Sequence, residues 1–198
     1  MVKYYRYICY HQYMQIFTSF TSDVEKLLKK GAVGVIPTDT VYGVVGSLLS
    51  SDTVARIYAV KARGPEKPVG TILIGDTSQI YDMVDPELLK KAQQYWPGAV
   101  SVVLPVSDEL SYAHKGFNSL PFTLPDNIKI QNLVSATGPL AISSANPASL
   151  QPSNTIEEAI KYFSDSVDFY VDGGDLSYSK PSKIIRFDEQ GNEEIIRG

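Results

Sequence analysis

Short apolar segments alternate with helical segments along most of the chain, and this alternation limits the possible fold more than any other feature. The apolar segments are rich in Val and Ile, whereas the helical segments carry apolar residues at helical spacing behind capping residues. The predicted strands are 15–17, 32–37, 69–74, 99–104, 140–143, 168–171, 183–187 and 193–197. The predicted helices are 23–30, a segment from Ser51 or Asp52 to Lys61, 86–95, 126–136 and 155–162. The order predicts a single α/β domain with a twisted mixed β-sheet and flanking helices.

The chain length fits one well-buried domain. At 198 residues it is a little short for two domains, and it shows no internal repeat or interdomain linker. Residues 1–13 differ from the rest because they hold five tyrosines. We predict that residues 1–13 are an N-terminal extension and that 14–198 form the domain. A stacking surface for RNA is the alternative role for these tyrosines.

Charge and composition exclude several classes of protein. The formal net charge of −4 argues against general attraction to a nucleic-acid backbone or an anionic membrane. Cys9 is the only cysteine and His11 and His114 are the only histidines, so neither an internal disulfide nor a closed Cys/His zinc site is expected. No apolar run approaches the length of a membrane span. We therefore expect a cytoplasmic protein without a membrane anchor or a bound transition metal.

Familiar catalytic motifs are absent from the sequence. Neither the G-x-x-x-x-G-K-[ST] phosphate loop nor the G-x-G-x-x-G dinucleotide fingerprint occurs. A Ser-His-Asp triad would need a histidine, but His114 lies in the polar run 111–116, which predicts a surface loop. A hydrolase built on these arrangements is therefore not expected.

Cationic and hydroxyl groups gather at the ends of predicted strands instead. The turn Thr38-Asp39-Thr40 follows the apolar strand 32–37, and strand ends are where α/β proteins place ligand sites. The segment 61–68 holds three cations and two prolines that stiffen the turn, which suits a polyphosphate, although helix-dipole compensation would also explain it. Ser143-Ser144-Ala145-Asn146 leaves another buried strand with hydroxyl and amide groups, either as an ordinary turn or as a ligand contact.

Several segments together resemble the YrdC-like family, whose enzymes include the L-threonylcarbamoyladenylate synthases. The family elements P-T-[ED]-T-x-Y-G, K-x-R, W-P-G, S-x-N, D-G-G, P-S-T-[IV] and I-[IL]-R-x-G resemble, in this order, 37–43, 61–63, 96–98, 144–146, 172–174, 181–184 and 195–198. The similarity runs from about residue 14 to residue 198. One such match is weak, but an ordered set is strong.

The resemblance implies a reaction. Family enzymes join L-threonine, bicarbonate or CO₂, and ATP with Mg²⁺ into threonylcarbamoyl-AMP and pyrophosphate. A downstream tRNA threonylcarbamoyl transferase complex then uses the product for N6-threonylcarbamoyladenosine (t6A) at position 37 of tRNA. A nucleotidyltransferase of this kind has no need to grip tRNA, which agrees with the acidic net charge.

The resemblance also implies roles for individual residues. The expected catalytic cations are Lys61 and Arg63. The expected ATP contacts are Arg63, Lys67, Ser144, Asn146 and Arg197. The expected threonine-binding residues are Thr38, Thr40, Tyr42, Ser182 and Lys183.

The sequence departs from the family at one position that bears on the substrate. Thr123 stands where many members have an Arg that is expected to hold the threonine carboxylate, and a hydroxyl cannot replace that ion pair. Lys183, which replaces a Thr of the family, or Lys115 would have to supply the missing cation. If neither does, the chain has another substrate. The alternative function is a catalytically degenerate RNA-binding protein with weak RNA contact, and a third reading is a carbamoyl-transfer accessory domain.

Overall fold

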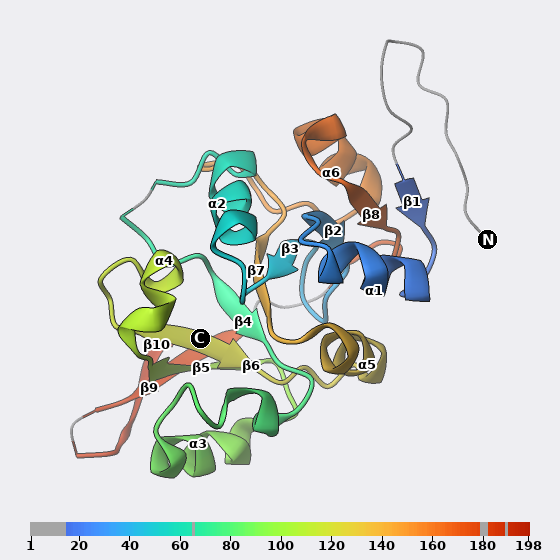
Figure 1. The fold of residues 1–198 in the computed structure, drawn as a ribbon. Helices are drawn as coiled ribbons and strands as arrows, with labels where there is room; N and C mark the ends of the chain where they lie inside the picture. Colours follow the sequence, from blue (N-terminus) through green and yellow to red (C-terminus); the bar gives the residue numbers. More distant parts are fainter. Residues whose placement is uncertain (1–14, 65, 179–181, 189) are drawn as a thin grey trace.

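The computed structural model describes residues 15–64, 66–178, 182–188 and 190–198, and these residues form one mixed β-sheet with helices packed on it (Figure 1). The strands are β1 Gln15–Phe17, β2 Gly34–Ile36, β3 Gly43–Ser47, β4 Thr71–Leu73, β5 Val100–Pro105, β6 Ser119–Thr123, β7 Leu140–Ser144, β8 Phe169–Val171, β9 Lys183–Phe187 and β10 Glu193–Arg197. Their spatial order is β1-β8-β2-β3-β7-β4-β6-β5-β9-β10. The β9–β10 hairpin and the β1–β8 pair therefore lie at opposite ends of the sheet.

The helices join these strands. The α-helices are α1 Ser22–Lys29, α2 Ser51–Val60, α3 Pro86–Ala92, α4 Ser111–His114, α5 Ile128–Thr137 and α6 Ile156–Phe163. Single 3-10 turns lie at Thr77–Ile80, Gln93–Tyr95, Asp108–Leu110 and Ser164–Ser166. Side-chain caps satisfy free N–H groups where helices begin. Asp85 accepts hydrogen bonds from the backbone of α3, and Ser50 caps α2 by accepting one from the N–H of Thr53.

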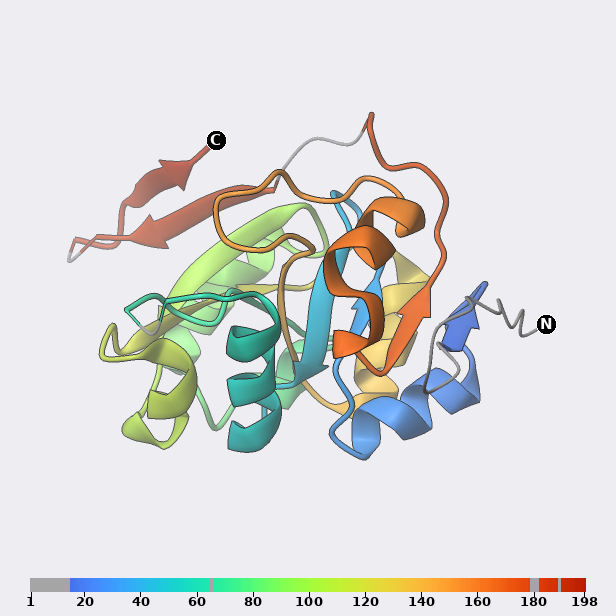
Figure 2. The same ribbon diagram turned by 90° about the horizontal axis from the view of Figure 1, so that it is seen from above.

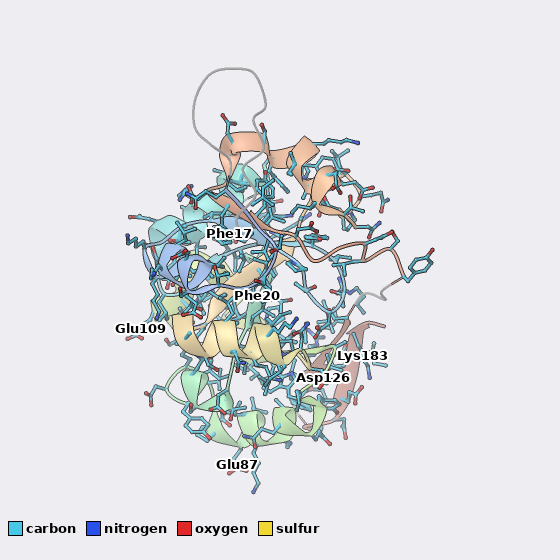
Figure 3. The ribbon with its side chains drawn as sticks, turned by 90° about the vertical axis from the view of Figure 1, so that its right-hand side faces the viewer. Phe17, Phe20, Glu87, Glu109, Asp126 and Lys183 are labelled. Carbon is cyan, nitrogen blue, oxygen red and sulfur yellow. The ribbon has the colours of Figure 1, made fainter. Side chains whose placement is uncertain are left out.

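Strand alternation divides the buried side chains into two clusters on opposite faces of the sheet. In β3, Val44 packs with the cluster that includes α2, α3, α4 and α6, whereas its neighbour Val45 packs with the cluster of α1 and α5. Phe17 is buried in the second cluster and Phe20 packs against it, beside α1 (Figure 3). Helices α2 and α4 lie side by side on their face (Figure 2). The sheet is therefore covered by helices on both faces around β2, β3 and β7.

The structure bears out the predicted fold class and most of the predicted elements. The strands at 183–187 and 193–197 have the predicted bounds. The sequence missed β3 and β6, because β3 holds two glycines and β6 holds a proline. The predicted extension 1–13 lies outside the described residues and stays a prediction. Among the described helices, none has the length and apolar composition needed to cross a bilayer.

His114 corrects one prediction. The polar run around it predicted a surface loop, but His114 ends the short helix α4 and its side chain is 1% exposed. Its Nδ1 accepts hydrogen bonds from the backbone N–H groups of Gly116 and Asn118. The histidine therefore holds a turn inside the protein, and it is not among the residues that line the cavity described below.

Candidate active site

A cavity of about 690 Å³ opens over the end of the sheet formed by β6, β5 and β9. Segments far apart in the sequence line it, most of them at strand ends or on strands. The lining residues come from 38–43, 63, 68–73, 98–103, 117–125, 130, 142–144, 152, 182–186 and 196–197. Three arginines, Arg63, Arg186 and Arg197, lie among them. A single cavity thus brings together several of the polar segments that the sequence singled out.

Alternation along the strands builds the floor of the cavity. Val102 of β5 and Phe122 of β6 are fully buried against the helices, so their neighbours Ser101 and Thr123 project to the other face and line the cavity. The hydroxyl oxygens of Ser101 and Thr123 lie 2.8 Å apart and share a hydrogen bond. The floor is therefore polar and uncharged at the position where the family resemblance expected an Arg.

The turn after β2 brings hydroxyl groups to the cavity. Thr38 Oγ1 accepts hydrogen bonds from the N–H groups of Thr40 and Val41, at 3.1 and 3.2 Å, and donates one to the carbonyl of Val41 at 2.6 Å. The Thr38 hydroxyl therefore closes the turn. Thr40 Oγ1 lies 3.1 Å from it and lines the cavity. Thr40 is consequently better placed than Thr38 to meet a ligand.

Tyr42 connects this turn to the Asp172-Gly173-Gly174 segment. Its hydroxyl donates to the carbonyl of Gly174 and accepts from the N–H of Gly173, both at 2.8 Å. Burial raises the pKa of Tyr42 to about 12, so the phenol stays neutral. Tyr42 lines the cavity with a ring whose hydroxyl already has two partners, which favours a supporting role.

Lys61 lies beneath the cavity wall and is not a lining residue. Its side chain is buried, and its ammonium donates to the carbonyl of Ser144 and, at 2.7 Å, to that of Asn146. Burial, aided by the charge of Arg63, lowers its pKa to about 8. The Ser144 hydroxyl, which lines the cavity, in turn donates to Asn146 Oδ1 at 2.6 Å. Lys61 therefore fixes the segment that presents Ser144.

Two of the cavity arginines come from the predicted nucleotide segments. Arg63 Nε donates to the carbonyl of Pro68 at 2.9 Å, which closes the loop after α2. Burial lowers the pKa of Arg63, but an arginine remains charged. Arg197 Nη2 donates to the carbonyl and the hydroxyl of Ser182, at 2.9 and 3.1 Å. The guanidinium groups are thus held by backbone carbonyls at the cavity rather than by carboxylates.

Four predicted site residues do not line the cavity: Lys61, described above, Asn146, Lys67 and Lys183. Lys67 is exposed, and its carbonyl accepts the hydrogen bond of the Tyr58 hydroxyl at 2.6 Å. Lys183, labelled in Figure 3, begins β9 on the same face as the buried Ile185, and its ammonium pairs with Glu193 of β10. Because adjacent strand residues face opposite sides, Lys183 points away from the cavity. Its assignment to threonine stays a prediction that this geometry does not support.

The sequence overlooked Arg186. It is the third residue after Lys183, and it lines the cavity together with Ile184 from the same face of β9. The predicted strand 183–187 already separated these two from Lys183 and Ile185 by alternation. The signal was therefore present, but it could be used only once the structure showed which face of β9 bounds the cavity.

The fold and the cavity together define a class of protein, and comparison with known proteins identifies its family. The model of the Sua5/YciO/YrdC family, described as "Telomere recombination", matches residues 26–198. The chain belongs to this family. It is 33% identical over 168 residues to a putative threonylcarbamoyl-AMP synthase of Mycobacterium tuberculosis, covering 80% of this chain and 74% of that protein. It is 33% identical over 162 residues to the threonylcarbamoyl-AMP synthase of Marinobacter nauticus, covering 78% of this chain and 84% of that protein.

Solved structures share the fold. Sua5 of P. abyssi, in a complex with L-threonine, superposes with a TM-score of 0.80 at 22% identity, covering 92% of this chain and 56% of that one. E. coli YciO superposes with a TM-score of 0.77 at 21% identity, covering 93% of this chain and 95% of that one. The chain thus spans about half the length of the Sua5 structure and nearly all of YciO.

Proposed function

We propose that this protein is an L-threonylcarbamoyladenylate synthase, which makes threonylcarbamoyl-AMP and pyrophosphate from L-threonine, bicarbonate or CO₂, and ATP. The observation that carries the proposal is the cavity: it gathers a hydroxyl-bearing turn, Ser144, Ser182 and three arginines in a member of a family whose relatives carry this activity in their names. The product would supply a tRNA threonylcarbamoyl transferase complex for t6A formation. The protein would thus act as a nucleotidyltransferase in the cytoplasm.

The proposed chemistry depends on placement and charge. The threonine amine attacks CO₂ and loses a proton to give a carbamate. A carbamate oxygen then attacks the α-phosphorus of ATP, and the bond between the α-phosphorus and the bridging oxygen breaks to release pyrophosphate. Such transfers need cations around the phosphates and an in-line approach. Arg63 and Arg197 supply the protein cations at the cavity, and Ser144 supplies a hydroxyl.

Magnesium belongs to the substrate in this proposal, because Mg²⁺ usually reaches such sites on the phosphates of the nucleotide. Asp39 is the carboxylate on the described cavity lining. Among the residues that the structure describes, no group of three or more His, Cys, Asp or Glu is arranged to hold a metal ion.

The proposal is tested by incubating the protein with ATP, bicarbonate and each amino acid in turn. We expect pyrophosphate release that requires both L-threonine and bicarbonate, and threonylcarbamoyl-AMP in the mass spectrum. Arg63→Ala should weaken ATP binding about ten- to a hundred-fold, because it removes a charge-assisted contact. Arg56→Ala is the matched control, since Arg56 lies on α2 outside the cavity and pairs with Asp168. Pyrophosphate release independent of any amino acid would refute the synthase.

A further inference from the structure

The proposed function leaves one charge without a partner. Threonine carries an α-carboxylate, and a carboxylate that enters a cavity without a cation is costly. Thr123 stands where the family resemblance expected the arginine for this group. Thr123 is 7% exposed, and its hydroxyl already pairs with that of Ser101 at 2.8 Å. The cation must therefore come from another position in the cavity.

The described lining offers three arginines, and two of them lie with the predicted nucleotide segments. Arg63 is tied to the loop after α2 by its bond to Pro68, and Arg197 is tied to Ser182. Both are predicted ATP contacts, so we reserve them for the phosphates. Arg186 remains, and neither the sequence nor the family resemblance gives it a role.

Arg186 lines the same cavity as the floor that lacks a charge. The strand register pairs Ile184 with Ser101 and Arg186 with Val103. Thr123, Ser101 and Ile184 thus form one row across β6, β5 and β9, and Arg186 lies two residues further along β9 on the same face. Neighbouring strands are about 4.8 Å apart and two residues advance about 6.7 Å along a strand, so a side chain as long as arginine can lean over this row.

A carboxylate of β10, the strand on the side of β9 away from β5, holds one edge of the Arg186 guanidinium. Its Nε donates to Glu194 Oε2 of β10 at 2.6 Å. Within the described residues, its two Nη groups make no hydrogen bond. Because the guanidinium is a planar fork with five N–H donors, a pair at Nε leaves donors with which to bind a second carboxylate.

We propose that Arg186 binds the α-carboxylate of the amino-acid substrate, in place of the cation expected at Thr123, and so makes the site specific for free amino acids. Glu194 is its positioning residue. This inference rests on the proposed function, because it takes threonine as the substrate. It differs from the idea that Lys183 supplies the cation, since Lys183 lies on the opposite face of β9 and pairs with Glu193.

The inference is tested with Arg186→Gln in the full chain. We expect the KM for L-threonine to rise about tenfold or more while the KM for ATP stays within about twofold, because only the amino acid loses a charge-assisted contact. Calorimetry without bicarbonate adds a readout that needs no turnover. The parent should bind L-threonine far more tightly than L-threoninol, which lacks the carboxylate, and Arg186→Gln should remove most of that difference.

Three further variants separate the explanations. Thr123→Arg added to Arg186→Gln should restore part of the threonine affinity, which a merely structural role of Arg186 would not allow. Arg56→Gln should change neither KM. The inference would be overturned if the KM for threonine were unchanged in Arg186→Gln. It would also be overturned if the KM for threonine rose in Lys183→Gln but not in Arg186→Gln.

The two proposals fail in different ways. A parent protein that turns over threonine, with Arg186→Gln equal to it, overturns only the role of Arg186. A parent that binds threonine through Arg186 but releases no pyrophosphate overturns only the synthase. A parent that neither binds nor turns over threonine overturns both.

Discussion

The same face of the β-sheet has two different uses on the two sides of β4: the side of β3 and β7, which we call the covered end, and the side of β6, β5 and β9, which we call the open end. Under β3 and β7, alternation points Val45 and Leu140 at helices α1 and α5, and both side chains are fully buried. Under β5, β6 and β9, the corresponding positions carry Ser101, Thr123 and Arg186, and they line the cavity. The backbone geometry is common to both ends, but the side chains on the shared face are not.

This difference shows how the sequence divides stability from function within one layer. The opposite face carries buried apolar side chains in both regions, with Val44 at the covered end and Phe122 and Ile185 at the open end. The cavity end is therefore anchored from one side only. On its other face, polar groups line the cavity. Burying these groups under a helix would cost free energy.

The largest expected effect comes from truncating the covered end. Leu140→Ala should lower the free energy of unfolding by about 2–5 kcal/mol, because it removes a fully buried side chain and leaves a cavity. Ile184→Ala, the matched truncation at the open end, should cost about 1 kcal/mol or less, since the side chain already faces the cavity. Urea denaturation of the two variants measures the difference. Equal losses would mean that the open end carries as much stability as the covered one.

Gly70 directly precedes β4, the strand between the two ends, and its substitution gives the next largest expected loss of stability. Its φ is +143°, and a Cβ there would lie 2.2 Å from the carbonyl oxygen of Ile142. Gly70→Ala should therefore cost about 2–3 kcal/mol and weaken ATP binding. Gly116→Ala is the control, because Gly116 has a φ of +87° but open space around it, so only backbone strain of about 1 kcal/mol is expected. Thermal melts of both variants check this order, and a smaller loss at Gly70 would contradict it.

Much of the covered end and of the hairpin could be predicted from the sequence, because local patterns specify them. The alternation and the turn between β9 and β10 are local signals, and the predicted bounds match. Strand β3 was missed because Gly43 and Gly46 weaken its pattern. Both glycines are explained only by contacts with other elements, since a Cβ would meet the side chains of Ile142 and Thr53 at 2.5 and 2.4 Å.

The residues of the cavity also divide into those that the sequence could predict and those that it could not. Resemblance placed Thr40, Ser144 and Arg197, which the structure brings to one lining. Their ligands stay predictions. The partner of Lys183 could not be read from the sequence, because the strand register sets Glu193 opposite Phe187 and only the side chains bring Glu193 to Lys183. Sequence alone marks which residues alternate on a strand, but it does not say which face holds a helix and which a cavity.

Lys61 should make the stability of the cavity wall depend on pH. Its pKa is about 8 in the folded protein, lowered mainly by burial, against 10.5 in the unfolded chain. Between these values the unfolded state binds more protons, so the stability rises with pH. Relative to Lys61→Met, the parent should gain about 1.5 kcal/mol between pH 8 and pH 9.5. Denaturant midpoints at the two pH values give this gain. Parallel curves for parent and variant would show that the ammonium is not desolvated, and Lys67→Met, at an exposed lysine, should run parallel to the parent.

The smallest expected effect concerns the polar floor itself. Ser101 and Thr123 are both buried and share a hydrogen bond of 2.8 Å, so removing one hydroxyl leaves the other without its partner. Ser101→Ala and Thr123→Val should each cost about 1 kcal/mol, whereas the double variant should cost little more than either one. The coupling free energy from this double-mutant cycle should be about 0.5–1.5 kcal/mol. A coupling near zero would mean that water in the cavity satisfies each hydroxyl equally well, and that the floor is wet in the absence of ligand. A coupling of the expected size would show that the open end keeps its own internal bonds, so that the polar residues over β5 and β6 are held in place before any substrate arrives.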